Sequence, residues 1–380
     1  MIEIQSDYAY QTVFTSQIDV LSIVTDQQQV RVRITTVNAI EIYNEVWVPV
    51  KNKITISGLS ELIEMAFIER DIVDGYISIS VTPLNGSGSA GCLFFPIFCN
   101  RMIQGITASE FRNDNFLCAQ KSKRIPPFVD IDLLAYVNTG DSKDFKVVYD
   151  FRILSDGRNV RNSFVVDNGG IQMDYEPVEF PVRYKDILED AVKDLDLSVY
   201  DIELLSFVVI NGNRSCTFFV DKSLRKRDVF YFRNCFNAWE IAALPMSVTA
   251  KSDVSRSLSY IDGKTVAYDN KLTRLFDVEA GPLSFQECSW IDQLLDSWNV
   301  VRPLSDVLSL PPYGSQWESL PFTPLKYSQV IITDSTCELS HSQESLNKVK
   351  FTWRYSDSFP VHSIDPSPGI FNDNYNLSFN

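Results

Sequence analysis

Histidine is scarce in this sequence, which has only His341 and His362 among its 380 residues. Most serine and cysteine nucleophiles are activated by a neighbouring imidazole, so the chain offers little material for that kind of catalysis. A metal site built from three histidines is excluded by number alone. A pairing of His341 with Cys235 stays open, because both lie in the same predicted domain.

The seven cysteines are odd in number, widely spaced and without a C-x-x-C pair. They are Cys92, Cys99, Cys118, Cys216, Cys235, Cys288 and Cys337. This pattern argues against a disulfide framework and a zinc site, and it predicts buried thiols in a reducing compartment. We therefore expect no metal and no other cofactor.

Long apolar runs and an excess of basic residues are missing too. The longest apolar runs, such as CLFFPIFC (92–99), are far shorter than the roughly 18 residues that span a bilayer. The first residues, MIEIQSDYAYQTVF, lack the basic and apolar regions of a secretory signal. The net charge of −15 repels nucleic acid, and the one basic cluster, SLRKRD (223–228), has no aromatic residues interleaved. We expect a protein made in the cytoplasm, with no nucleic-acid partner and no membrane insertion.

Strand signals are present throughout the chain. Branched apolar residues alternate with polar ones in DVLSIVT (19–25) and VRVRITTV (30–37), as half-buried strands require. Turn signals separate further apolar runs: NG at 211–212, DG at 262–263 and GG at 169–170. The sequence predicts a mainly β, multi-domain protein of sandwich or barrel-like units, with a few short helices packed on the sheets.

Three segments have helical periodicity, at 59–71, 186–197 and 284–298. The last begins with a capping box, in which Ser284 is the N-cap and Glu287 lies three residues on. Its predicted apolar face consists of Phe285, Cys288, Ile291, Leu294, Leu295 and Trp298. We expect this face to pack against the sheet that contains KVKFTWRY (348–355).

Composition divides the chain into four parts. A basic, proline-bearing break, KSKRIPPF (121–128), ends a β-rich domain of residues 1–125 that holds the helix at 59–71. Residues 126–225 are predicted to form a β-sandwich of the immunoglobulin or fibronectin kind, and residues 226–358 a β-rich domain with the capped helix. Residues 359–380 are expected to be an extended C-terminal arm.

The arm keeps four large apolar side chains, Phe371, Tyr375, Leu377 and Phe379. Leaving them in water is unfavourable, at roughly 25 cal/mol per Å². We therefore predict that the arm lies on a neighbouring chain, and a frayed terminus is the alternative.

The segment YFRNCFNAWEIAAL (231–244) places Cys235 between Arg233 and Glu240, where it is either a nucleophile or a packed thiol. If residues 230–241 form one extended strand, both faces mix large aromatic residues with single polar groups. A strand covered on two sides has this pattern, and it predicts buried partners for Arg233 and Glu240. We favour the packed thiol.

Two other segments are weaker candidates for a catalytic or ligand-binding site. The glycine-rich NGSGSAG (85–91) lacks the lysine of a phosphate-binding loop and precedes a strand, which predicts a hairpin loop. Asp130 and Asp132 share a strand face, but such pairs in an acidic chain are usually solvated. No catalytic residue is assigned.

One loop, PPYGSQWESLPF (311–322), offers Tyr313 and Trp317. Sugar rings stack on such side chains, so these two are candidate ligand contacts. The alternative is an ordinary connection pinned by its aromatic residues.

Residues 229–357 contain several distinctive stretches: FRNCFNAWE, a VSRS strand before the DG hairpin, VEAGPL before the capped helix, and VIITDSTCELSHSQESLNKVKFTWRYSD (330–357). Together they resemble a family of uncharacterised, virion-associated proteins from prophages of gut Bacteroidetes. The resemblance implies a place in phage tail or virion assembly and lends no catalytic residues.

The first hypothesis is therefore a non-enzymatic structural component of a phage tail, of adaptor, distal-tail or baseplate type. Its partners would be copies of itself and other tail proteins, and its location the virion. A receptor-binding or carbohydrate-binding protein that takes a cell-surface glycan is the second hypothesis. A hydrolase of cell-surface polysaccharide is the third.

Overall fold

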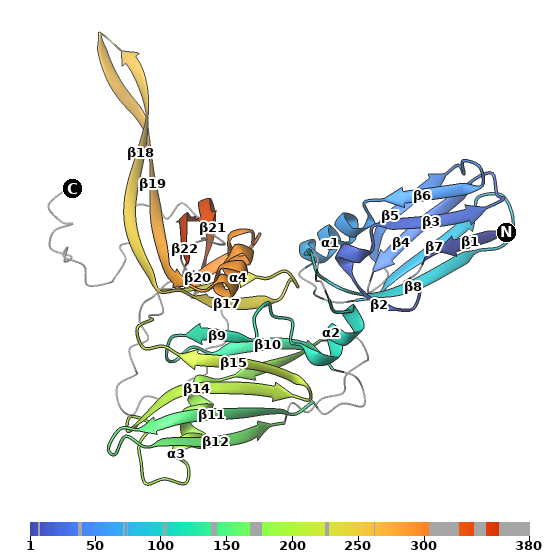
Figure 1. Ribbon diagram of the computed structural model, residues 1–380. Helices are drawn as coiled ribbons and strands as arrows, with labels where there is room; N and C mark the ends of the chain where they lie inside the picture. The colour runs from blue at the N-terminus through green and yellow to red at the C-terminus, as the bar shows by residue number, and fades with distance from the viewer. Residues whose placement is uncertain are drawn as a thin grey trace. The chain divides into compact units, whose positions relative to one another are not determined.

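The structure is a computed structural model of the chain. It describes residues 1–356 except 7, 37–39, 71–72, 74, 102, 104, 138–142, 168–176, 225–227, 262, 304–326 and 338–346. The described residues form five separate sheets and four short α-helices (Figure 1). The fold is therefore mainly β, as the sequence predicts.

The chain folds into two compact units, each made of several stretches of sequence. The first unit consists of Met1–Lys123, Asp130–Phe219 and Arg233–Glu240. The second consists of Arg124–Val129, Val220–Phe232 and Ile241–Asn380. The four-part division expected from composition stays a prediction.

The N-terminal part of the first unit has two sheets around one core. Its strands are β1 (Ile2–Gln5), β2 (Thr12–Phe14), β3 (Val20–Thr25), β4 (Val30–Thr36), β5 (Ile40–Trp47), β6 (Lys53–Ser57), β7 (Ile77–Pro83) and β8 (Ala90–Ile97). The sheet orders are β1-β3-β6 and β2-β8-β7-β4-β5. Alternation decides which side chains enter the core, as in β4, where Val30, Val32 and Ile34 are buried. Helix α1 (Leu59–Glu69) adds Phe67 to the same core.

A second group of strands follows along the chain. They are β9 (Ser122–Ile125), β10 (Ile131–Tyr136), β11 (Phe145–Ile153), β12 (Asn159–Val166), β13 (Pro177–Val182), β14 (Ile202–Asn211) and β15 (Arg214–Val220). Five of them form a sheet ordered β12-β11-β14-β15-β9, and β10 pairs with β13. The Phe180 ring meets those of Phe145 and Phe116 edge to face, with centroids 5.2 and 5.7 Å away.

The remaining strands form a seven-stranded sheet ordered β17-β16-β20-β21-β22-β19-β18. They are β16 (Val229–Arg233), β17 (Trp239–Ala243), β18 (Met246–Ile261), β19 (Lys264–Leu283), β20 (Val300–Pro303), β21 (Tyr327–Cys337) and β22 (Asn347–Tyr355). Helix α4 (Phe285–Leu295) packs against β21 and β22, as predicted from its apolar face.

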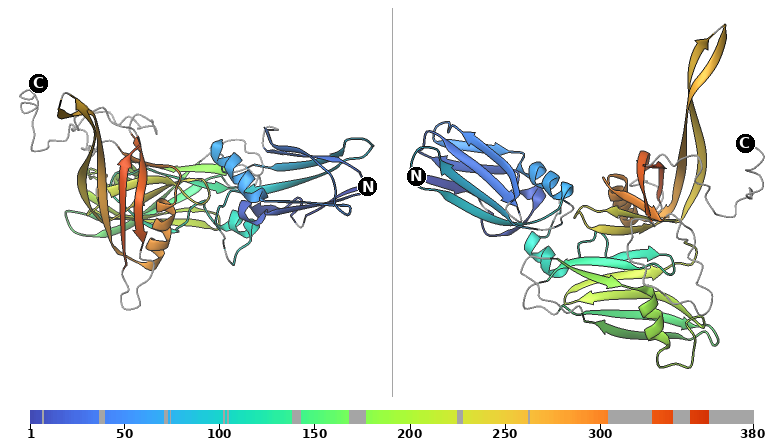
Figure 2. Two further views of the ribbon diagram at one scale, coloured as in Figure 1. Left: turned by 90° about the horizontal axis from the view of Figure 1, so that it is seen from above. Right: turned by 180° about the vertical axis from the view of Figure 1, so that it is seen from behind.

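Strands β18 and β19 extend well past the other strands of this sheet (Figures 1 and 2). They pair with each other from Met246–Ala280 to Ile261–Lys264, so the DG signal at 262–263 does mark a hairpin. Strand β22 pairs with β19 only from Phe276 onward. We call residues 251–275 the distal ribbon, because there the two strands have only each other as partners among the described strands.

The capping box of α4 is confirmed. The Glu287 N–H donates to Ser284 Oγ at 3.2 Å, and the Ser284 N–H donates to Glu287 Oε2 at 2.8 Å. The apolar face is shorter than predicted, because the helix ends at Leu295 and leaves Trp298 44% exposed. Trp290, absent from the prediction, is buried.

The other helices differ from the prediction at their ends. Helix α1 ends two residues early, and α3 (Tyr184–Val192) begins before residue 186 and ends before 197. Helix α2 (Ala108–Asp114) was not predicted, although its own capping box, Thr107 with Glu110, is legible in the sequence. A short 3-10 turn, η1 (Thr15–Gln17), completes the set.

The turn at the NG signal lies one residue further along the chain than predicted. At the NG signal Asn211 is still a strand residue paired with Arg214, so the two-residue loop is Gly212-Asn213, with Gly212 at φ 56°. The Asn211 side chain donates to the Asp144 carbonyl at 2.9 Å. The GG signal at 169–170 lies outside the described residues.

Candidate functional site

The segment around Cys235 is not the single strand predicted for residues 230–241. Strand β16 ends at Arg233 and β17 begins at Trp239, with a tight turn at residues 234–238 between them. The turn holds Asn237 at φ 55°, a left-handed conformation that asparagine tolerates better than most residues. Cys235 therefore lies in a turn that belongs wholly to the first unit.

The side chain of Asn234 organises this turn. Its Oδ1 accepts the N–H groups of Phe236 and Ala238 at 2.9 and 3.1 Å. Its Nδ2 donates to the Leu117 carbonyl at 3.0 Å and to Glu240 Oε2 at 2.6 Å. With two bonds accepted and two donated, the amide has used its full hydrogen-bonding capacity. Asn234 is therefore structural.

A buried ion pair lies beside the turn. Lys123 Nζ is 2.6 Å from Glu240 Oε1, and the two side chains are 2% and 1% exposed. Burial by itself lowers the pKa of Lys123, but the Glu240 carboxylate and the nearby thiols outweigh it, so this pKa is raised. The Ala119 N–H donates to the other Glu240 oxygen at 3.2 Å. Both oxygens of the Glu240 carboxylate therefore have a hydrogen-bonding or ion-pair partner.

The buried partners predicted for Arg233 and Glu240 are thus present. Arg233 donates to the Asn237 carbonyl at 2.8 Å, and its guanidinium lies over the Trp239 ring, 4.3 Å from the centroid. Residues Ser122–Ile125, within the predicted break at 121–128, form strand β9. Lys123 points inward from that strand because Glu240 compensates its charge.

Cys235 has the surroundings of a packed thiol. It is buried in an apolar cluster with Phe14, Phe111 and Phe236, and the last two rings stack at 4.7 Å. A hydrogen bond with the Cys99 thiol, reinforced by burial, holds the pKa of Cys235 well above its ordinary value. A thiol that stays protonated is a poor nucleophile. His341, its one candidate partner for catalysis, lies outside the described residues.

The paired carboxylates at Asp130 and Asp132 also serve structure. Asp130 Oδ1 accepts the Tyr184 N–H at 2.8 Å, at the start of α3. Asp132 accepts a hydrogen bond from Arg183 Nη1 at 2.7 Å. Both carboxylates thus accept hydrogen bonds from residues at the start of α3, and these bonds hold the helix against β10 and the residue before it.

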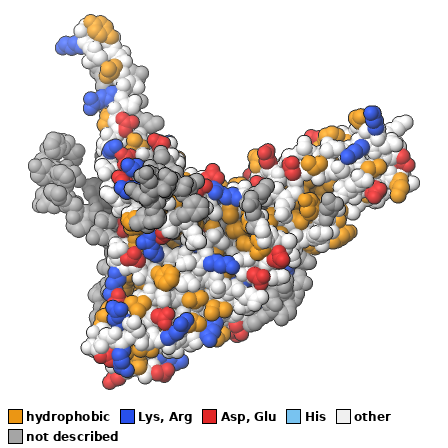
Figure 3. Space-filling view, viewed as in Figure 1, with side chains coloured by type: hydrophobic (Ala, Val, Ile, Leu, Met, Phe, Trp, Pro, Cys, Tyr) orange, Lys and Arg blue, Asp and Glu red, His pale blue; other side chains and the backbone are white. Residues whose placement is uncertain are grey.

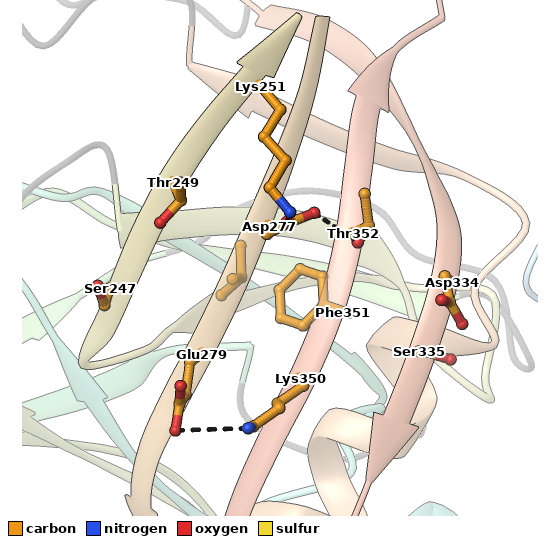
Figure 4. A pocket seen from close by; sticks show the side chains of 11 residues that line it. Ser247, Thr249, Lys251, Asp277, Glu279, Asp334, Ser335, Lys350, Phe351 and Thr352 are labelled. Atoms are coloured by element: carbon orange, nitrogen blue, oxygen red, sulfur yellow. Dashed lines mark hydrogen bonds and ion pairs between the residues drawn. The ribbon is translucent and has the colours of Figure 1, made fainter. Parts of the chain in front are cut away.

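The second unit has a polar hollow on one face of its large sheet (Figure 4). Its volume is about 480 Å³. Side chains from four neighbouring strands line it, most of them polar: Ser247, Thr249, Lys251, Asp277, Val278, Glu279, Asp334, Ser335, Lys350, Phe351 and Thr352. Period-two alternation places the polar residues of β18, β19 and β22 on this one face. No sequence prediction singled out this surface.

Opposite charges are matched across the hollow. Lys251 bonds to Asp277, and Thr352 Oγ1 donates to Asp277 Oδ1 at 2.9 Å. Lys350 Nζ lies 3.8 Å from Glu279 Oε1. The bond from Lys251, followed by that from Thr352, lowers the pKa of Asp277, so this carboxylate is an anion and not a proton donor at neutral pH. The hollow can hydrogen-bond a polar ligand, but its chemistry is that of a binding surface.

The candidate ligand contacts Tyr313 and Trp317, and the arm residues Phe371, Tyr375, Leu377 and Phe379, lie outside the described residues. Within the part of the chain that the structure describes, no three His, Cys, Asp or Glu side chains are grouped so that they could hold a metal ion. Among the described helices, none combines the length and the apolar character needed to cross a bilayer.

No protein-family model matches the sequence, and no curated protein matches it. Among solved structures, the chain is similar to a crystal structure of a Salmonella alpha-2-macroglobulin mutant, at 7% identity with a TM-score of 0.19 over 73% of this chain. The chain spans 22% of the length of that protein. A likeness at this level carries no argument about function.

Proposed function

We propose that the chain is a structural component of a bacteriophage tail, of adaptor, distal-tail or baseplate type, that works by protein–protein assembly. The observation that carries the proposal is the β18–β19 hairpin, whose distal ribbon leaves the sheet and extends without further partners among the described strands. A two-stranded ribbon is marginally stable by itself in water, so an extension of this length is best explained by a partner that covers it.

The chemistry of the described side chains supports assembly over catalysis. The buried polar groups around Cys235 bond to one another and hold a turn. The carboxylates of the polar hollow that have partners are bonded to lysines. The resemblance of residues 229–357 to virion-associated prophage proteins adds the phage context.

The test is the presence of the protein in particles. Phage particles should be induced from a strain that carries the gene, purified on a density gradient and analysed by mass spectrometry. We expect the protein to co-purify with the tail proteins at a fixed ratio, and immunogold labelling to mark the tail. Particles that are complete without the protein would overturn the proposal.

The polar hollow favours one second candidate, a carbohydrate-binding protein. Hydroxyl, carboxylate and ammonium groups line it, and such groups hydrogen-bond to sugar hydroxyls. Binding to a glycan array that is lost in Thr249→Ala and Lys350→Ala, and also in Tyr313→Ala and Trp317→Ala, would favour this function. Binding that none of these variants changes would count against it.

A further inference from the structure

On strand β18, one side of the distal ribbon is mainly apolar and the other is polar. Alternate residues of β18 point to opposite sides, and on one side Val254, Leu258 and Tyr260 are exposed, with Ser252 and Arg256 between them. We call this side the apolar face; Val248, at the base of the hairpin, is exposed on the same side. Leu258 is 62% and Tyr260 74% exposed. The intervening positions are polar up to residue 259: Ser247, Thr249, Lys251, Asp253, Ser255, Ser257 and Ser259.

The apolar face of the ribbon continues the buried face of the sheet. Val248 of β18 pairs with Val278 of β19, which pairs with Phe351 of β22, and the last two are buried. The polar face continues the hollow of Figure 4, which Ser247, Thr249 and Lys251 line. Strand β18 therefore keeps the alternation of a covered sheet at Val254, Leu258 and Tyr260, although no described strand covers this stretch and Arg256 interrupts its apolar side.

The edge of β18 is a second surface on which another chain could bind, through backbone hydrogen bonds. Strand β18 is the last strand in its sheet, and β19 is its one described neighbour. A long edge strand presents a row of free N–H and C=O groups that another chain can pair with, and proteins usually block such edges. Here Lys251 and Arg256 are the basic residues on this strand, and no proline interrupts it.

Net charge indicates which partner the ribbon binds. Residues 251–275 contain five basic and three acidic residues, a net charge of +2 in a chain of −15, so the remainder carries −17. Figure 3 shows hydrophobic and basic side chains along the projecting hairpin, with acidic ones among them nearer its base. A weakly basic ribbon is attracted to a partner of negative net charge, and every further copy of this chain has one.

We propose that the distal ribbon docks, through its apolar face and the edge of β18, on a second copy of this chain, whose negative net charge attracts it. The contact is heterologous, since the ribbon of one copy meets a different surface of the next, and contacts of this kind generate rings or filaments. The proposal rests on the assembly function proposed above and names its contact.

The test compares two variants with the same change in charge and the same spacing on one strand. Val254→Asp/Leu258→Asp places two carboxylates on the apolar face, and Ser255→Asp/Ser259→Asp places two on the polar face. Self-association of the full chain is measured by sedimentation velocity over a wide range of protein concentration, with circular dichroism to check the fold. We expect the apolar-face variant to raise the dissociation constant about tenfold or more, and the polar-face variant to change it far less.

Charge reversal gives an independent arm of the same test. Arg256→Glu should weaken self-association, and its effect should shrink as salt is added. A wild-type chain that stays monomeric at all concentrations, or two double variants that weaken association equally, would overturn the proposal. A ribbon that instead binds another tail protein would also overturn it. Because these assays use purified protein, the inference can fail while the protein is still found in particles, and the reverse also holds.

Discussion

The turn at residues 234–238 and the distal ribbon differ in which kind of side chain they bury and which they expose. At the turn, polar groups are buried: Glu240 is 1% exposed, and both of its oxygens have partners. Along the ribbon, apolar side chains such as Leu258 are exposed, and the described chain covers none of that face. A buried polar group that is fully bonded indicates structure, whereas an exposed apolar row in a regular strand indicates a surface made for a partner.

The largest loss of stability is expected when one partner of the buried ion pair is removed. Glu240→Gln leaves Lys123 charged and buried without compensation, which should lower the free energy of unfolding by about 3–5 kcal/mol. The matched control is Glu41→Gln, since Glu41 also lies 2.6 Å from its arginine, Arg33, but on an exposed surface. The control should cost at most about 1 kcal/mol. Equal losses in urea denaturation would mean that the burial of the pair is unimportant.

Truncation of two leucines in the second unit tests the same contrast with apolar groups. Leu294 in α4 is fully buried, so Leu294→Ala should cost about 2–5 kcal/mol. Leu258→Ala on the ribbon should cost only about 0.5 kcal/mol, because the side chain is exposed in the isolated chain. The measurement is thermal unfolding of dilute protein. A large loss at Leu258 would show that the ribbon is covered by its own chain.

The buried thiol of Cys92 should make the stability of the protein depend on pH. Burial raises the pKa of Cys92 in β8 from 9.0 to about 11. Because the unfolded chain ionises first, the contribution of this thiol is complete below about pH 9 and is lost as the pH rises toward 11. Wild type should therefore lose roughly 2 kcal/mol more than Cys92→Ala over that interval. Parallel stability curves for the two proteins between about pH 8 and 11 would contradict the assignment.

Two helix caps of the same chemistry provide the finest comparison. The Ser284 capping box of α4 is partly buried, and the Thr107 box of α2 is exposed. Ser284→Ala should cost about 1 kcal/mol and Thr107→Ala about half as much, since water can replace the second cap. Ser284→Thr is the control that keeps the oxygen. If the two alanine variants cost the same, burial does not strengthen the cap.

Local patterns in the sequence predicted much of this fold. Alternation in VRVRITTV predicted β4, and Ser284 with Glu287 predicted the start of α4, because both signals are complete within a few residues. The need of Arg233 and Glu240 for partners was also legible, since single polar residues among aromatic ones cannot stay unpaired.

Contacts between residues that are far apart in the sequence could not be predicted. The partner of Glu240 is Lys123, which composition assigned to a basic break between domains. The turn at 234–238 was missed because it has no glycine or proline and depends on the side chain of Asn234. The alternation in the distal ribbon is visible in SDVSRSLSY, but only the sheet order reveals that no described strand covers it.

The interleaving of the two units has a consequence for synthesis on the ribosome. The first unit needs Arg233–Glu240 as well as Met1–Lys123, and the stretch Val220–Phe232, made just before the missing piece, belongs to the second unit. At roughly 5–20 residues per second, Lys123 waits on the order of ten seconds before Glu240 is made. During that interval the nascent chain carries an unneutralised lysine where the core will be, so the first unit cannot close early. Completion of the first unit thereby waits until Glu240 has been made, and the second unit, which includes Ile241–Asn380, is completed later still.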